Sequence, residues 1–169
     1  MRIILGVLAS LIFSLNLAAA QEAVTDEGET GLTLPRFVSL RSSHINARSG
    51  PGARYPIEWV YMQKSAPVEI VAEFELWRKI KDWQGSESWV HKSMLSGKRF
   101  AKVTTPGENN LYDKADYKSK VIARVEDEVV GEITKCPAVN AFCRVRFGNV
   151  EGWIPRQNIY GVYSNEVID

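Results

Sequence analysis

One stretch of this chain is written twice at a spacing of 64 residues, and this duplication limits the folds that the sequence can adopt. Three pairs of identical residues share that offset: Asn46 and Asn110, Trp89 and Trp153, Gly97 and Gly161. The runs that precede Trp89 and Trp153, residues 77–81 and 142–146, align at an offset of 65. Solenoid repeats are shorter, roughly 20–50 residues, so this period indicates two small domains in tandem.

Residues 1–20 have the features of a secretory signal peptide. Arg2 supplies the positive start, residues 3–17 are a mostly apolar run, and we expect cleavage after Ala20. The alternative is an uncleaved membrane anchor, but the run is shorter than the roughly 20 apolar residues that a bilayer span needs. We therefore expect an exported protein, periplasmic or secreted, with no stable membrane span after cleavage.

Charge argues against one class of partner. Loss of residues 1–20 removes Arg2 and takes the formal net charge from +1 to 0. Binding of nucleic acid needs clustered Lys and Arg, so we expect no nucleic-acid partner. Residues 21–35 contain acidic but no basic side chains and little apolar content, which predicts a flexible acidic leader.

Each copy consists of short β-rich runs separated by turn residues, such as residues 67–74, 76–82 and 88–91 of the first copy. So many short strands in about sixty residues cannot bury both faces of an open sheet. We therefore predict an all-β fold of two small tandem barrels, 36–98 and 99–163, followed by a tail, 164–169. Since the linker between the copies is short and itself strand-like, we expect the barrels to touch.

Cys136 and Cys143 lie seven residues apart between two predicted strands. In an oxidising compartment they predict a disulfide that closes a hairpin loop, which would contribute about 2–2.5 kcal/mol in the chain-entropy model. A nucleophilic thiol would need a neighbouring base, and both histidines, His44 and His91, lie in the first copy.

Four motifs of the first copy form a recognisable set: Asn46 to Gly52, Pro67 to Val71, Trp77 to Ile80, and Trp89-Val90 followed by Ser93 to Leu95. They resemble the bacterial Src-homology-3-type domains of exported and cell-wall-associated proteins, although Ser88 replaces the family's glycine before Trp89. The second copy is more diverged: it keeps Gly152-Trp153-Ile154 and lacks the Arg-x-Gly-Pro motif. The resemblance covers about residues 37–163. It implies Src-homology-3-like barrels with a targeting or sensing role, and peptidoglycan stem peptide is one ligand that it suggests.

The Arg-Ser-Gly-Pro-Gly run at residues 48–52 predicts a tight reversal after the first strand. Pro51 fixes φ near −65°, and Gly50 and Gly52 can adopt positive φ. Arg48 would then tie the loop to a carbonyl or carboxylate. Alternatively, it clamps a ligand carboxylate through a bidentate pair.

Aromatic residues of the first copy suggest a binding groove. Period-two alternation puts Trp77, Lys79 and Trp83 on the outer face of their strand and Ile80 in the core. In the resembling fold the preceding loop covers that face, so peptide or sugar could stack there. The ligand-binding candidates are Arg48, Tyr55, Glu58, Trp59, Tyr61, Trp77, Lys79 and Trp83. Alternatively, these aromatics pack between the barrels. The equivalent surface of the second barrel is expected at Tyr112, Phe142, Pro155 and Tyr160.

Catalytic signatures are weak in this sequence. The two histidines have no Cys or carboxylate at metal-ligand spacing, and there is no Gly-x-Ser-x-Gly nucleophile motif. We expect no metal, no cofactor and no enzyme activity. The favoured hypothesis is an exported binding module for a peptide, peptidoglycan or an envelope protein. The alternatives are a module for dimerisation or docking onto an envelope enzyme, and a cell-wall hydrolase; the oligomeric state stays open.

Overall fold

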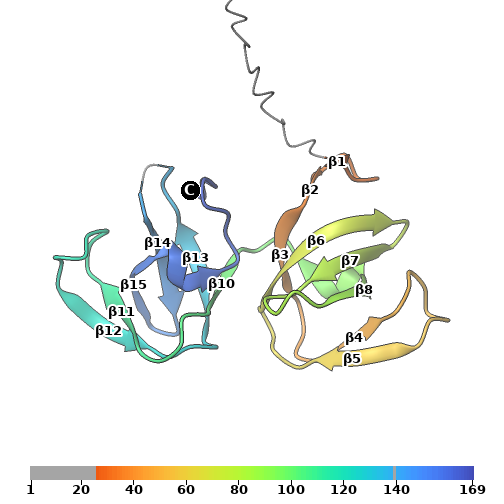
Figure 1. The fold of residues 1–169 in the computed structure, drawn as a ribbon, viewed down its shortest axis with the longest axis horizontal. Helices are drawn as coiled ribbons and strands as arrows, with labels where there is room; N and C mark the ends of the chain where they lie inside the picture. The colour runs from red at the N-terminus through yellow and green to blue at the C-terminus, as the bar shows by residue number, and fades with distance from the viewer. Residues whose placement is uncertain (1–25, 139) are drawn as a thin grey trace, which may run out of the picture.

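The computed structural model describes residues 26–138 and 140–169, so the predicted signal peptide and the start of the predicted leader lie outside the described residues. Two seven-stranded antiparallel sheets curl into two barrels that lie side by side (Figure 1). The all-β prediction is therefore confirmed. In the described ranges, no helix has the length and apolar character needed to cross a membrane.

The first barrel runs from residue 36 to residue 96. Its elements are β3 (Arg36–Leu40), β4 (Ile45–Arg48), β5 (Ile57–Tyr61), β6 (Pro67–Phe74), β7 (Trp77–Lys81), β8 (Glu87–His91), the 3-10 turn η1 (Lys92–Met94) and β9 (Leu95–Ser96). Their order across the sheet is β5-β4-β8-β7-β6-β3-β9. Because β5 and β9 are the two ends of that order, the sheet is curled without being hydrogen-bonded all the way round.

The second barrel repeats this topology strand for strand. It consists of β10 (Phe100–Val103), β11 (Asn109–Tyr112), β12 (Val121–Val125), β13 (Val130–Lys135), β14 (Phe142–Phe147), β15 (Val150–Pro155), η2 (Arg156–Asn158) and β16 (Ile159–Tyr160). The sheet order is β12-β11-β15-β14-β13-β10-β16, which matches the first barrel position by position. Even the register shifts recur, at Ala47/Arg48 and again at Leu111/Tyr112. The duplication seen in the sequence is therefore a duplication of the fold.

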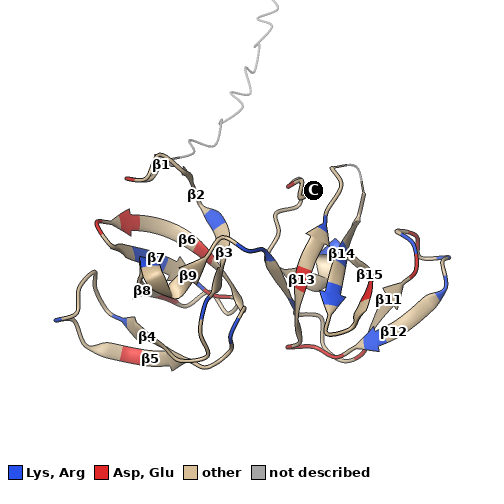
Figure 2. Ribbon diagram, turned by 180° about the vertical axis from the view of Figure 1, so that it is seen from behind, with Lys and Arg blue, Asp and Glu red and all other residues tan. Residues whose placement is uncertain are grey.

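Each barrel has a hydrophobic core of its own. In the first, alternation along β7 buries Ile80 completely and leaves Trp77 and Lys79 partly exposed, as the period-two pattern predicts. In the second, Val145 and Ile154 are fully buried in a separate cluster. Basic and acidic positions are interspersed over both barrels (Figure 2), and they form local cross-strand pairs such as Arg146 with Glu132.

The second half of the predicted flexible leader differs from that prediction. Strands β1 (Asp26–Glu27) and β2 (Thr33–Leu34) form a hairpin, and Leu34 joins the core of the first barrel. The hairpin is anchored by Glu73, whose side chain is fully buried. Glu73 accepts hydrogen bonds from the backbone N–H of Thr30 at 2.8 Å and from Arg36 at 2.5 Å. One buried carboxylate thus compensates for the low apolar content of the segment.

The predicted disulfide and the predicted tail meet at one place. Cys136 and Cys143 are bonded, as expected. Backbone hydrogen bonds join Cys136 to Ile168 in both directions, at 2.7 and 3.0 Å. The buried side chain of Arg156 donates to the carbonyls of Tyr163, Glu166 and Pro137. The C-terminal segment is consequently bound to the second barrel.

The barrels touch through an aromatic contact. The ring of Phe37 on β3 packs against Tyr160 at 5.0 Å and Tyr163 at 4.6 Å between centroids. Both tyrosines also bond to the first barrel: the Tyr160 hydroxyl donates to the Lys81 carbonyl at 3.1 Å, and the Tyr163 hydroxyl donates to Glu69 at 2.6 Å. The expectation that the barrels touch is confirmed.

We predict that Phe37→Ala uncouples the two barrels. Removing a buried phenylalanine ring costs about 3–5 kcal/mol, and here most of that loss falls on the contact between the barrels. We expect calorimetry to show one unfolding transition for the wild type and two for the variant. Phe74→Ala, which removes an exposed ring of the same barrel, is the control. Unchanged single-transition melting of the Phe37 variant would contradict this role.

We also predict an acid-dependent loss of stability through Glu73. Burial acts to raise the pKa of Glu73, but hydrogen bonds from Arg36 and Thr30 outweigh burial and hold this pKa below its usual range. The ionised carboxylate therefore stabilises the fold above the unfolded pKa of about 4.3, and this contribution is lost as the pH falls further. Thermal melts from pH 7 to pH 3 should show a smaller drop in Tm for Glu73→Gln than for the wild type. An equal pH dependence of Tm in the two proteins would refute this role of Glu73.

Candidate functional site

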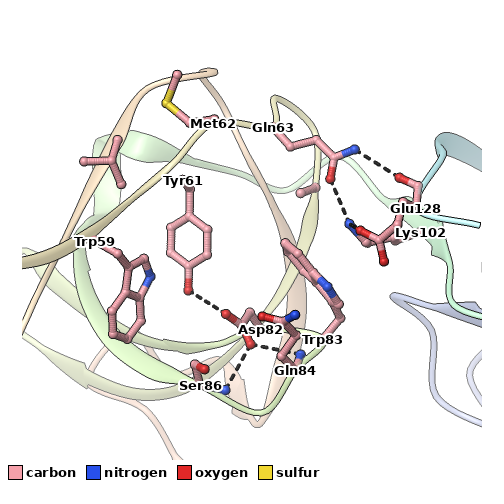
Figure 3. A pocket seen from close by; sticks show the side chains of 12 residues that line it. Trp59, Tyr61, Met62, Gln63, Asp82, Trp83, Gln84, Ser86, Lys102 and Glu128 are labelled. Atoms are coloured by element: carbon pink, nitrogen blue, oxygen red, sulfur yellow. Dashed lines mark hydrogen bonds and ion pairs between the residues drawn. The ribbon is translucent and has the colours of Figure 1, made fainter.

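A hollow of about 520 Å³ opens where the first barrel meets the second. Trp59 and Tyr61 reach it from β5, and Trp83 reaches it from the turn after β7. In Figure 3 the rings of Trp59 and Trp83 stand on opposite sides of the pair formed by Tyr61 and Asp82. The volume lies within the range of small-ligand sites, about 300–1,000 Å³.

A buried carboxylate forms the polar floor of this hollow. Asp82 accepts hydrogen bonds from the Tyr61 hydroxyl at 3.1 Å and from the backbone N–H groups of Gln84 and Ser86 at 3.0 and 2.9 Å. Burial raises the pKa of Tyr61 to about 12, so its hydroxyl remains a donor at neutral pH. The Asp82 side chain thus fixes both the turn that carries Trp83 and the position of Tyr61.

The second barrel supplies a cation to the same hollow. Lys102 on β10 is 1 % exposed, and its ammonium lies 3.7 Å from the centre of the Trp83 ring. It donates to Gln63 Oε1 at 3.0 Å and forms an ion pair with Glu128. Gln63 in turn donates through Nε2 to the Glu128 carbonyl at 3.1 Å (Figure 3). The hollow is therefore built by both barrels.

Five of the eight predicted ligand residues lie away from this hollow, and three of these are Trp77, Lys79 and Glu58. Trp77 packs edge-on against His91 at 5.6 Å between ring centroids, and Lys79 forms an ion pair with Glu87. Trp83 follows β7 in a turn and packs against the core of the first barrel, whereas Trp77 lies at the start of β7 and does not line the hollow. Glu58 is exposed and adjoins Trp59 on β5, so it points to the opposite face of that strand.

Arg48 and Tyr55 hold their own loop together. Arg48 Nη1 donates to the Tyr55 carbonyl at 2.6 Å, which is the carbonyl tie expected of the turn. Gly50 and Gly52 do not adopt positive φ, contrary to the prediction. The ring of Tyr55 lies against both glycines, and a Cβ on Gly52 would stand only 3.3 Å from that ring. Glycine is required at these two positions because the Tyr55 ring approaches closely, and not because the backbone adopts a left-handed conformation.

The corresponding hollow of the second barrel has different walls. The strand pairing aligns Ala123 with Trp59 and places Val125 at the position of Tyr61. Those residues, together with Arg124, Glu126 and Phe147, line a hollow of about 410 Å³. The aromatic and carboxylate pattern of the first hollow is therefore not repeated there.

The candidate residues of the second barrel separate into two groups. Tyr112 and Phe142 are buried against each other at 5.8 Å, and Pro155 is paired with Phe142 across the sheet. Phe142 and Pro155 occupy the positions that Trp77 and His91 have in the first barrel. Tyr160 instead lies in the contact between the barrels, where burial raises its pKa. These residues do not form the equivalent of the first hollow.

A second hollow, about 680 Å³ in volume, lies between β3 and the C-terminal segment. Its three arginines are ion-paired, Arg36 and Arg78 with Glu73 and Arg99 with Glu166, although Arg36 Nη1 is buried without a hydrogen-bond partner among the described residues. The aromatic residue among those lining it is Phe37, whereas Trp59, Tyr61 and Trp83 all line the first hollow. The first hollow therefore offers more aromatic surface beside its polar groups.

Comparison with known sequences identifies the fold's family. The sequence model described as "Bacterial SH3 domain" matches residues 41–97 and again residues 105–161. The chain belongs to the bacterial SH3 domain family. Bacterial SH3 domains are binding modules, so the coarse part of the functional hypothesis is supported. They are also commonly extracellular or associated with the cell wall, and the disulfide fits such a compartment.

Two solved structures are similar to this tandem of bacterial SH3 domains. NlpC2 from Trichomonas vaginalis is 14% identical with a TM-score of 0.34, covering 75% of this chain and 48% of that one. NlpC1 from the same organism is 15% identical with a TM-score of 0.33, covering 88% of this chain and 50% of that one. The chain thus spans about half the length of these structures. No curated protein matches it.

Sequence reasoning missed the polar half of the hollow. Gln63, Lys102 and Glu128 line it but belong to no motif of the bacterial SH3 domains quoted above. One signal was available: Lys102 interrupts an otherwise apolar run, Phe100-Ala101-Lys102-Val103, in the segment predicted to join the barrels. A lysine within an apolar run indicates a buried charge, which needs charged or polar partners.

We predict that Arg48→Ala reduces stability and leaves ligand affinity unchanged. The lost hydrogen bond involves a charged donor, and such bonds contribute about 1.5–3 kcal/mol. Chemical denaturation measures the loss, with Arg54→Ala, an exposed arginine of the same loop, as the control. A variant of wild-type stability that binds purified cell wall more weakly would assign Arg48 to the ligand instead.

Proposed function

We propose that this protein is an exported, non-enzymatic binding module that recognises a peptide of the cell envelope, with peptidoglycan as the favoured source. The aromatic hollow of the first barrel is the binding site. The observation that carries this proposal is the convergence of Trp59, Tyr61 and Trp83 on one hollow with a buried carboxylate beneath them.

The physical argument rests on the kind of surface that the hollow offers. Partly exposed indole rings give large contact areas with few rotatable bonds, and they are enriched where proteins bind peptides and other partners. Asp82 keeps the walls in place, because its hydrogen bonds to Tyr61 and to the turn of Trp83 hold them before any ligand arrives. Walls that are fixed in advance lower the entropy cost of binding.

The two halves of the tandem would then have different tasks. The hollow of the second barrel has Ala123 and Val125 where the first has Trp59 and Tyr61, so it offers no stacking surface of this kind. The second barrel serves mainly to complete and support the site of the first.

We predict that Trp59→Ala weakens binding to purified cell wall by about 2 kcal/mol, roughly thirtyfold, as expected for a central aromatic contact. The test is a pull-down of the mature protein with purified wall, combined with titration of intrinsic Trp fluorescence. Trp77→Ala removes an indole of the same barrel outside the hollow and serves as the matched control. Retention of the mature protein in the supernatant, with unchanged fluorescence, would overturn the proposal.

A module for dimerisation or for docking onto an envelope enzyme is the competing function. The exposed apolar side chains Phe74 and Leu76 at the β6–β7 turn favour it. Light scattering distinguishes the two, since a mass that rises with protein concentration supports self-association. Trp59→Ala should leave that mass unchanged if Phe74 and Leu76 form the contact.

A further inference from the structure

We propose that Lys102 is the anion anchor of the hollow and that it takes a carboxylate of the bound peptide in place of Glu128. The ligand class is thereby narrowed to peptides with a free carboxylate, whether at the C-terminus or on a side chain. This inference rests on the proposed function and concerns the same site.

Lys102 is placed as an anchor by the fold. Its strand, β10, is the first of the second barrel, and its side chain leaves that barrel to end in the hollow of the first. The Trp83 ring lies beneath the ammonium at 3.7 Å, and Gln63 Oε1 accepts from it at 3.0 Å. Both contacts come from rigid or hydrogen-bonded groups, so they fix the position of the charge.

Glu128 differs from Trp83 and Gln63, the other partners of Lys102, because its carboxylate is exposed to solvent. Its side chain is 63% exposed, whereas that of Lys102 is 2% exposed. The Glu128 backbone is held in the left-handed region, at φ 65°, by a bond from its N–H to the Val103 carbonyl and by the bond from Gln63. Only the carboxylate reaches over the cation, and it can turn into solvent without disturbing the backbone.

A buried ammonium requires a counter-charge, because an unpaired charge in a low-dielectric site is strongly unfavourable. Glu128 meets this requirement in the free protein and can yield its place to a carboxylate that arrives along the indole walls. The other acid of the hollow cannot play that part, since Asp82 already accepts from Tyr61, Gln84 and Ser86. The carboxylate that a ligand can replace is therefore that of Glu128, the counter-ion of Lys102.

The experiment uses peptides released from purified cell wall, in native form and with their carboxylates converted to amides by carbodiimide and ammonia. Binding of each to the full mature protein is followed by Trp fluorescence. We expect amidation to weaken binding about tenfold or more, because hydrogen bonds to charged groups are among the strong ones. A defined pair, Ac-Ala-Ala-Ala with a free C-terminus and its C-terminal amide, distinguishes the terminal carboxylate from those on side chains.

Three variants test the assignment to Lys102. Lys102→Met should lose the preference for native over amidated peptides, and it leaves no buried unpaired charge because the side chain of Glu128 is 63% exposed. Glu128→Gln leaves the cation in place and removes its competitor, so we expect native peptides to bind roughly two- to fivefold more tightly. Glu126→Gln, an exposed acid on the same turn, is the matched control and should change nothing.

The outcomes separate this inference from the proposed function. Failure of both peptide forms to bind overturns the proposed function together with the inference. Equal binding of native and amidated peptides leaves the proposed function standing and overturns the anchor. Unchanged or weaker binding of native peptides by Glu128→Gln also overturns it, and this variant remains informative if Lys102→Met does not fold.

Discussion

The contact of Phe37 with Tyr160 and Tyr163 fixes how the two barrels sit, and the other features of the site depend on it. A barrel of about sixty residues buries a modest core, and a loose linker would leave the pair free to turn. Because the tyrosine hydroxyls also bond to Lys81 and Glu69, the rings are held in one orientation. Lys102 can only reach the neighbouring hollow if that orientation is kept.

Much of the fold could be predicted because its signals are local. The repeated Trp residues, the alternation around Ile80 and the spacing of the cysteines each reflect a short-range rule, and each is confirmed. The site could be predicted only in part. Which residues line the hollow depends on their position along a strand and on how the two barrels are placed, and the sequence patterns report neither. Trp77 and Trp83 are only six residues apart, yet only Trp83 lines the hollow, while Lys102 joins the site from the other copy. The leader hairpin was missed since Glu73 lies well outside the segment that it anchors.

The two copies have diverged in side chains while their backbones have kept the same plan. Strand order and register shifts recur, yet Trp59 and Tyr61 are replaced by Ala123 and Val125. Core positions tolerate exchange among apolar residues of similar volume, so the fold can persist while surfaces change. Such divergence is expected when one copy must keep particular side chains at its surface and the other needs only apolar residues that fill its core. It explains why the family match extends over both barrels while the site does not.

The hollow lined by both barrels makes the site a property of the pair. Neither barrel alone can place an ammonium over the Trp83 ring, because Lys102 and that ring belong to different barrels. Cutting the chain between the barrels therefore removes this arrangement without changing a single side chain.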